Sequence, residues 1–145
     1  MKVSTKGRYA LRMLLDLSIH QDGGYVSLSD ICSRQDISKK YLEQIVSMLS
    51  KDGLLRTNRG NRGGYMLTKP VDKYTVGDIL RATEGSLAPV SYLDYQAENE
   101  CSTEENMTHY VWQGLYEIEN KYLDSITLAD IIEHGCEKPG DDYYI

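Results

Sequence analysis

Two arginines in a glycine-rich segment are the first residues whose chemistry suggests a ligand. Arg59 and Arg62 lie three residues apart within NRGNRG, residues 58–63, a composition that favours a turn. Glycines let the backbone approach another surface closely, and a guanidinium can enter the electronegative minor groove of DNA. The segment therefore predicts contact with a polyanion, although such sequences also form ordinary turns.

A second polar set precedes this loop at helical spacing. Gln44 can form paired hydrogen bonds with adenine, Glu43 can accept from the cytosine amino group, and lysines can reach phosphates. Lys39 and Glu43 could instead form a surface ion pair that contributes ~0.3 kcal/mol. The residues predicted to bind DNA here are Ser38, Lys39, Lys40, Tyr41, Glu43, Gln44, Arg59, Gly60, Arg62 and Tyr65.

A helix followed by a hairpin must position these side chains. Ser38 is a good N-cap residue, and Gly53 is typical of a helix C-terminus. Between them, an apolar stripe at helical spacing consists of Leu42, Ile45, Val46 and Leu49. Short strands are expected at 54–56 and 64–68, on either side of the arginine loop. This order indicates a winged helix-turn-helix.

The preceding residues are expected to complete that unit. Ser4 or Thr5 is predicted to cap a helix that stops at Gly23-Gly24, and its apolar face consists of Tyr9, Ala10, Met13, Leu14, Leu17 and Ile19. A short strand at 26–27, a helix at 28–34 and a turn at 36–37 follow. Ser4, Lys6 and Arg8 are candidate phosphate contacts at the first helix N-terminus.

A second region is predicted after Pro70. Thr75 is expected to cap a helix that ends at Gly85, and residues 86–106 to form a sensing loop or a plain connection. A long amphipathic helix starts at Thr108, and we expect a final short helix from 127 to 133, before Gly135. The long helix has more apolar surface than a small domain covers, which favours dimerisation over packing within one subunit. Its predicted contacts are Val111, Trp112, Leu115, Ile118 and Tyr122.

Charge divides the chain in the same way. Residues 1–70 hold 12 Lys and Arg against 6 Asp and Glu, a net +6, whereas residues 71–145 carry a net −12 within the total of −6. The basic part can bind phosphates by counterion release, and the acidic part is available for dimerisation or sensing.

Other classes of protein fit less well. There is no P-loop and no Ser-His-Asp order, so we expect no enzyme and no catalytic residues. A protein-binding module without DNA contact is the alternative, but it would not need the two loop arginines. The three cysteines are widely spaced and predict neither disulfides nor a zinc site. With no membrane span and no signal-peptide core, a cytoplasmic protein is expected.

Several segments resemble the Rrf2 family of bacterial winged-helix regulators: MKVSTKGRYALRMLLDL, ISKKYLEQIVSMLSKDGLL, RGNRGGYMLT, TVGDILRATEG and YLDSITLADI. The resemblance covers residues 1 to about 133. It implies a homodimeric transcriptional regulator that binds double-stranded DNA, with a mainly α fold and a small β-hairpin wing. We expect a DNA-binding domain at 1–70, a sensing loop and dimerisation helices at 71–134, and a flexible tail at 135–145.

One branch of this family binds a [2Fe–2S] cluster through three cysteines and a histidine. Tyr92 and Asn106 stand where two of the cysteines would fall, Cys101 lies within about one residue of the third, and His109 matches the histidine. Because a cluster usually has four protein ligands, we expect no metal and no cofactor here. The alternative is that Cys101 and His109 are ligands of a cluster or of a metal shared across a dimer.

The C-terminus is similar to that of the family branch that represses cysteine and sulfur metabolism genes. In that branch the resemblance implies a complex with O-acetylserine (thiol)-lyase. A free carboxylate on an aliphatic residue can imitate an amino-acid ligand, so Tyr143, Tyr144 and Ile145 are the predicted partner-binding tail, with a frayed terminus as the alternative. The sequence thus favours a cysteine-metabolism repressor over an iron–sulfur or redox sensor.

Overall fold

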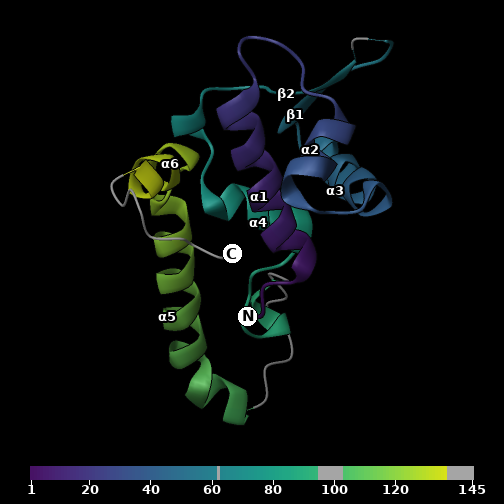
Figure 1. Cartoon of the computed structure of the whole chain (residues 1–145). Coiled ribbons are helices and arrows are strands. Elements are labelled where there is room, and N and C mark those ends of the chain that lie inside the picture. The colour runs from purple at the N-terminus through teal and green to yellow at the C-terminus, as the bar shows by residue number, and fades with distance from the viewer. Residues whose placement is uncertain (62, 95–102, 137–145) are drawn as a thin grey trace.

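The computed structural model describes residues 1–61, 63–94 and 103–136, and the side chains of 103–106 are not among the described ones. Within these ranges the chain is mostly helical with one antiparallel hairpin, as predicted (Figure 1). The elements are α1 (Thr5–His20), α2 (Leu28–Gln35), α3 (Lys39–Lys51), β1 (Leu55–Asn58), β2 (Gly64–Leu67), η1 (Val71–Lys73), α4 (Val76–Glu84), η2 (Ser91–Leu93), α5 (Thr103–Ser125) and α6 (Leu128–Cys136).

Helices α1, α3 and α4 each begin after a residue whose side-chain hydroxyl caps the helix, as the sequence predicts. The Oγ of Ser4 accepts from the backbone N–H of Gly7, and the Oγ of Ser38 accepts from that of Tyr41, each at 3.2 Å. Thr75 forms a reciprocal capping box with Asp78 at the start of α4. These bonds satisfy backbone donors that have no partner inside the helix, which confirms the three predicted N-termini.

Other predicted boundaries are wrong by several residues. Helix α1 ends at His20, before the two glycines. The N–H of Gln21 donates to the Leu17 carbonyl as the last bond of the helix, and the Gln21 side-chain oxygen accepts from the N–H of Leu67. At residues 26–27 only Val26 pairs, in an isolated bridge. Helix α5 begins at Thr103, inside the expected loop, and α6 continues through Gly135 to Cys136.

One hydrophobic core joins both sides of Pro70. Met13, Leu14 and Leu17 of α1 pack in it with buried residues of α2, α3 and α4, and with Leu128 of α6. Tyr74 is fully buried there, and its hydroxyl donates to the carbonyl of Leu54 at 2.7 Å. The boundary at residue 70 stays a prediction, since the core does not stop there. Ile19 was expected on the buried face of α1 but is 60% exposed.

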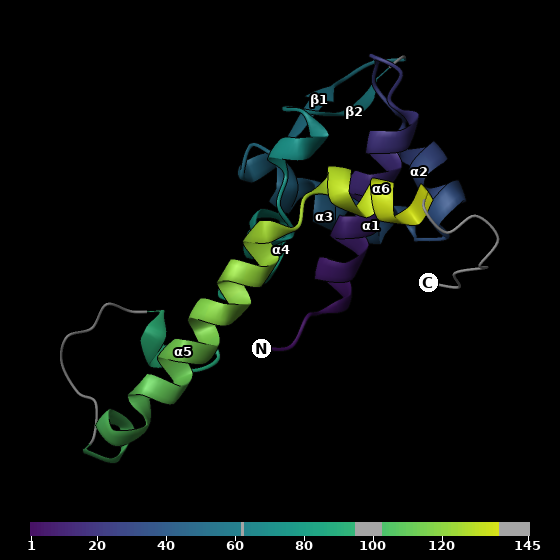
Figure 2. The same ribbon diagram turned by 90° about the vertical axis from the view of Figure 1, so that its left-hand side faces the viewer.

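Helix α5 extends away from this core (Figures 1 and 2). Its C-terminal part packs against α4, where the guanidinium of Arg81 donates to both carboxylate oxygens of Asp124 at 2.8 and 2.9 Å. The same guanidinium donates to the side-chain oxygen of Asn120 at 2.7 Å. The end of α5 is thereby fixed to the core, while its N-terminal part projects. None of the described helices is long and apolar enough to cross a membrane.

Candidate nucleic-acid interface

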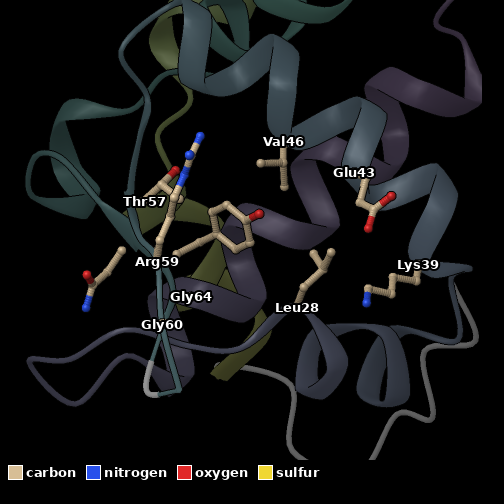
Figure 3. A pocket seen from close by; sticks show the side chains of 11 residues that line it. Leu28, Lys39, Glu43, Val46, Thr57, Arg59, Gly60 and Gly64 are labelled. Carbon is tan, nitrogen blue, oxygen red and sulfur yellow. The ribbon is translucent and has the colours of Figure 1, made fainter.

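A cleft of about 450 Å³ separates α3 from the hairpin. Figure 3 shows Lys39 and Glu43 of α3 on one side of it, with Thr57 and Arg59 on the other. These four residues are exposed, and the buried face of α3 holds Ile45 and Leu49 instead. The helix therefore turns its polar side chains toward the same open space as the hairpin, as the sequence predicts.

A second groove lies on the other side of the α3 polar face. It has a volume of about 550 Å³ and includes Lys6 of α1 beside Lys40, Gln44 and Ser47 of α3. Glu43 lines both this groove and the cleft. The first turn of α1 thus adds a cation to the surface of α3, which agrees with the predicted location of Lys6.

The hairpin is fixed to the helices by backbone hydrogen bonds. Val26 and Tyr65 exchange two of them, from the N–H of Val26 to the carbonyl of Tyr65 at 2.9 Å and in the reverse direction at 2.8 Å. The backbone of Val26 approaches Gly64 so closely that a Cβ on Gly64 would collide with the Val26 carbonyl. Gly64 therefore permits the close packing of the hairpin on the segment that precedes α2.

A buried ionic network also supports α2, which packs against both α1 and α3. Asp16 of α1 is 1% exposed and accepts two hydrogen bonds from Arg34 of α2, at 2.7 and 2.9 Å. Gln35 donates to the same carboxylate at 3.0 Å. Sequence reasoning missed these residues. The available signal was a charged residue, Asp16, among the apolar positions of the first helix.

Ser4 and Tyr41 have structural contacts that the sequence did not predict. The Ser4 hydroxyl, a predicted phosphate contact, donates instead to the Glu84 carboxylate of α4 at 2.6 Å. The Tyr41 ring packs edge-on against Tyr9, with 5.5 Å between ring centroids.

Arg8 is exposed, and its guanidinium donates to Thr5. Gly60 and Tyr65 line the cleft, whereas Arg62 lies outside the described residues.

Apolar side chains remain exposed along α5. Ile118 is 69% and Tyr122 63% exposed, and Leu115 and Val111 continue the row with 39% and 43%. Trp112 is only half-buried. Contiguous apolar surface of this kind marks an interaction site, so the arrangement agrees with the predicted dimer contact.

Of the four expected cluster-ligand positions, only those of Tyr92 and His109 have described side chains. The ring of Tyr92 in η2 packs against the ring of His109 in α5, with centroids 5.8 Å apart and planes tilted by 34°. Iron–sulfur clusters are held mainly by thiolates, which a phenol does not replace. Across 1–61, 63–94 and 103–136, no group of three His, Cys, Asp or Glu side chains could hold a metal ion. Cys101 and the predicted tail residues lie outside the described residues.

Comparisons with known proteins agree with this geometry. The Rrf2 family, described as iron-dependent transcriptional regulators, matches residues 3–134. The HTH-type transcriptional regulator IscR of Erwinia tasmaniensis is 39% identical over 135 residues, which cover 92% of this chain and 80% of that protein.

Two solved structures have a similar fold. CymR, the global cysteine regulator of B. subtilis, is 35% identical with a TM-score of 0.74, and the match covers 92% of this chain and 98% of CymR. IscR of T. potens is 34% identical with a TM-score of 0.72, covering 100% and 94% of the two chains. Both matches span most or all of this chain.

Proposed function

This chain belongs to the Rrf2 family of DNA-binding transcriptional regulators, and from that premise we propose that α3 and the hairpin together read a specific DNA sequence. The observation that carries the proposal is the cleft between them, where Lys39, Glu43 and Arg59 meet around an open space. According to this proposal, α3 enters the major groove of the DNA. The hairpin forms the wing that places Arg59 in the adjacent minor groove.

Each polar residue of this surface is given a role by its position. Glu43 and Gln44, at the centre of the exposed α3 face, contact base edges, while Lys39, Lys40 and Lys6 contact phosphates. Arg8 and Arg62 add positive charge near the duplex. Ser4 is left out of the phosphate contacts because its hydroxyl already bonds to Glu84.

The proposed active unit is a homodimer formed through the exposed row on α5. The pair Ile118 and Tyr122 is its centre, since both side chains are more than half exposed. A two-fold protein matches an operator with two half-sites about one helical turn, ~34 Å, apart. Helix α5 projects away from α3 (Figure 2), so a dimer formed through α5 is expected to leave both DNA-reading surfaces free.

The proposed role is repression of cysteine and sulfur metabolism genes, controlled through O-acetylserine (thiol)-lyase. Support comes from the similarity to CymR, a cysteine regulator, and from the aromatic-aliphatic terminus at residues 143–145. The cytoplasm is the proposed location. Deleting Tyr144 and Ile145 should abolish binding to the lyase of the same organism and leave DNA affinity unchanged. Unchanged lyase affinity would remove this part of the proposal.

A second candidate is an iron–sulfur or redox-sensing regulator of cluster-assembly genes. The identity with IscR proteins and the iron-dependent description of the family favour it. The Tyr92 ring, which packs against His109, speaks against it, because a phenol stands where a thiolate ligand is needed. We therefore propose that no cluster is bound. Anaerobically purified protein should lack visible absorbance from iron–sulfur charge transfer, and such absorbance with stoichiometric iron and sulfide would favour the second candidate.

Selecting genomic fragments with the purified full-length chain tests the DNA-binding proposal and distinguishes the two roles. We expect a recurrent two-fold sequence upstream of cysteine or sulfur metabolism genes. Enrichment upstream of cluster-assembly genes would favour the iron–sulfur role, and enrichment of no sequence would contradict specific DNA reading.

A further inference from the structure

An apolar groove of about 590 Å³ lies between α1 and α6, separate from the proposed DNA contacts. Helix α6 crosses α1 there (Figure 2). The walls include Leu15 and Ile19 of α1, and Ile131, Ile132 and Cys136 of α6. Ile19 is 60% exposed, so a large aliphatic side chain at the rim has little cover. Such a groove favours an apolar occupant over water.

The chain supplies a segment that can reach this groove. Cys136 is both part of its wall and the last described residue, and residues 137–145 follow. Seven residues separate Cys136 from Tyr143, a stretch that spans at most about 23 Å when extended and less where it turns. The α6 wall from Ile131 to Cys136 is only about 7.5 Å long at the helical rise. The segment is therefore long enough to turn back over the groove.

The sequence after α6 also contains a reversal signal. In Lys138-Pro139-Gly140-Asp141, proline and glycine hold the two central positions that a type II turn requires. A turn there would direct the following residues back along α6. The apolar residues of the segment come after this turn, at Tyr143, Tyr144 and Ile145, while the charged Asp141 and Asp142 lie next to it.

We propose that residues 143–145 dock in the α1–α6 groove of their own chain. The aromatic rings and the isoleucine cover Ile19 and Ile132, and burial of that apolar surface drives the docking. The consequence for regulation rests on the tail function proposed above: a docked tail is withheld from its enzyme partner, so partner affinity is lowered by the fraction of chains in the docked state.

Hydrogen exchange of the full-length chain tests the docking without any partner. We compare it with a variant that lacks residues 143–145. Deletion should make peptides from residues 15–20 and 131–136 exchange several-fold faster, and peptides from α3 should be unchanged. Equal exchange in the two proteins would overturn the proposal. A difference that grows with protein concentration would also overturn it, because a second copy would then cover the groove.

A variant of the groove tests the same contact from the other side. Ile19→Asp should reproduce the faster exchange of 131–136 without unfolding the chain, because the side chain is already exposed. Combined with the deletion it should add nothing further, whereas additive effects would mean independent causes and contradict docking. Tyr25→Asp, an exposed aromatic position outside the groove, is the matched control.

Lyase binding then separates the two proposals. If the tail docks and also binds the lyase, Ile19→Asp should raise lyase affinity several-fold above that of the unmodified chain. If exchange supports docking but neither protein binds the lyase, the partner proposal fails and the docking stands. If the lyase binds both proteins with equal affinity, the docked tail is not withheld, and the regulatory part is overturned.

Discussion

The Arg34 guanidinium holds the buried Asp16 carboxylate through two parallel hydrogen bonds, from Nε to Oδ2 at 2.9 Å and from Nη2 to Oδ1 at 2.7 Å. The pair joins α1 to α2, and α2 in turn packs on α3. An aspartate this deeply buried requires a partner, because an unpaired charge in the core is strongly destabilising. The pair is therefore part of what keeps α3 in place.

Removing the guanidinium should destabilise the fold. Arg34→Met retains much of the aliphatic stem but leaves the Asp16 carboxylate with one hydrogen-bond donor, Gln35, and the more distant His20 ring at 3.7 Å. We therefore expect the free energy of unfolding to fall by about 1.5–3 kcal/mol. Urea denaturation measures it. Lys121→Met, at an exposed position of α5, should change stability by less than about 0.5 kcal/mol. Equal stability of the Arg34 variant and the unmodified protein would refute a structural role for the pair.

The same pair predicts a pH dependence. Burial raises the pKa of Asp16, but the hydrogen bonds from Arg34 and Gln35 outweigh it and hold the pKa below its ordinary value of 3.8. A lowered pKa in the folded state means that the stabilisation is complete above this ordinary value and is lost as the pH falls below it. The His20 ring lies 3.7 Å from the same carboxylate, so the comparison is made in a His20→Gln background. There the stability difference between the chains with Asp16 and with Asp16→Asn should shrink as the pH falls into acid. A difference that grows on acidification would contradict the assignment.

Gly64 should be required for the position of the wing. Gly64→Ala places a Cβ against the Val26 carbonyl, so the Val26–Tyr65 bridge must shift, at a cost of about 1–3 kcal/mol. We expect weaker binding to selected operator DNA with the helical content retained. Gly24→Ala is the control, since a Cβ at Gly24 meets open space. Operator affinity that falls equally in both variants would show that the contact with Val26 is not the cause.

Local signals predicted most of the helices because their causes are local. Ser38 and Thr75 cap α3 and α4 through bonds to residues three positions ahead, which a sequence pattern records directly. The end of α1 could not be predicted in this way. Gln21 turns the chain there by accepting from Leu67, 46 residues later, before the two glycines are reached.

The candidate site also contains both kinds of feature, those with local causes and those that depend on distant residues. The polar face of α3 follows from helical spacing, and the structure places Lys39 and Glu43 as expected. The role of Asp16 depends on donors from another helix, and the hydrogen bond from Ser4 to Glu84 joins residues 80 positions apart. Helix α6 passes through Gly135, although the sequence predicts that it ends before this glycine. Such contacts depend on tertiary packing, so a local sequence pattern does not predict them.

The exposed row on α5 should control the oligomeric state. Ile118→Asp introduces a charge at the centre of the proposed interface, so we expect monomers in sedimentation experiments at concentrations where the unmodified chain is dimeric. Gln113→Asp adds the same group to the same helix outside the row. Dimers of the Ile118 variant would show that the chain associates through another surface.

The most direct test of the central claim is the affinity of Arg59→Ala for the selected operator and for random DNA, measured side by side. If the wing guanidinium reads a narrow groove, operator binding should weaken by about 1–3 kcal/mol, with a smaller loss on random DNA. Lys121→Ala, a cation on α5 away from α3 and the wing, should leave both affinities unchanged. Unchanged operator affinity of Arg59→Ala, or a loss confined to random DNA, would contradict DNA reading by α3 and the wing.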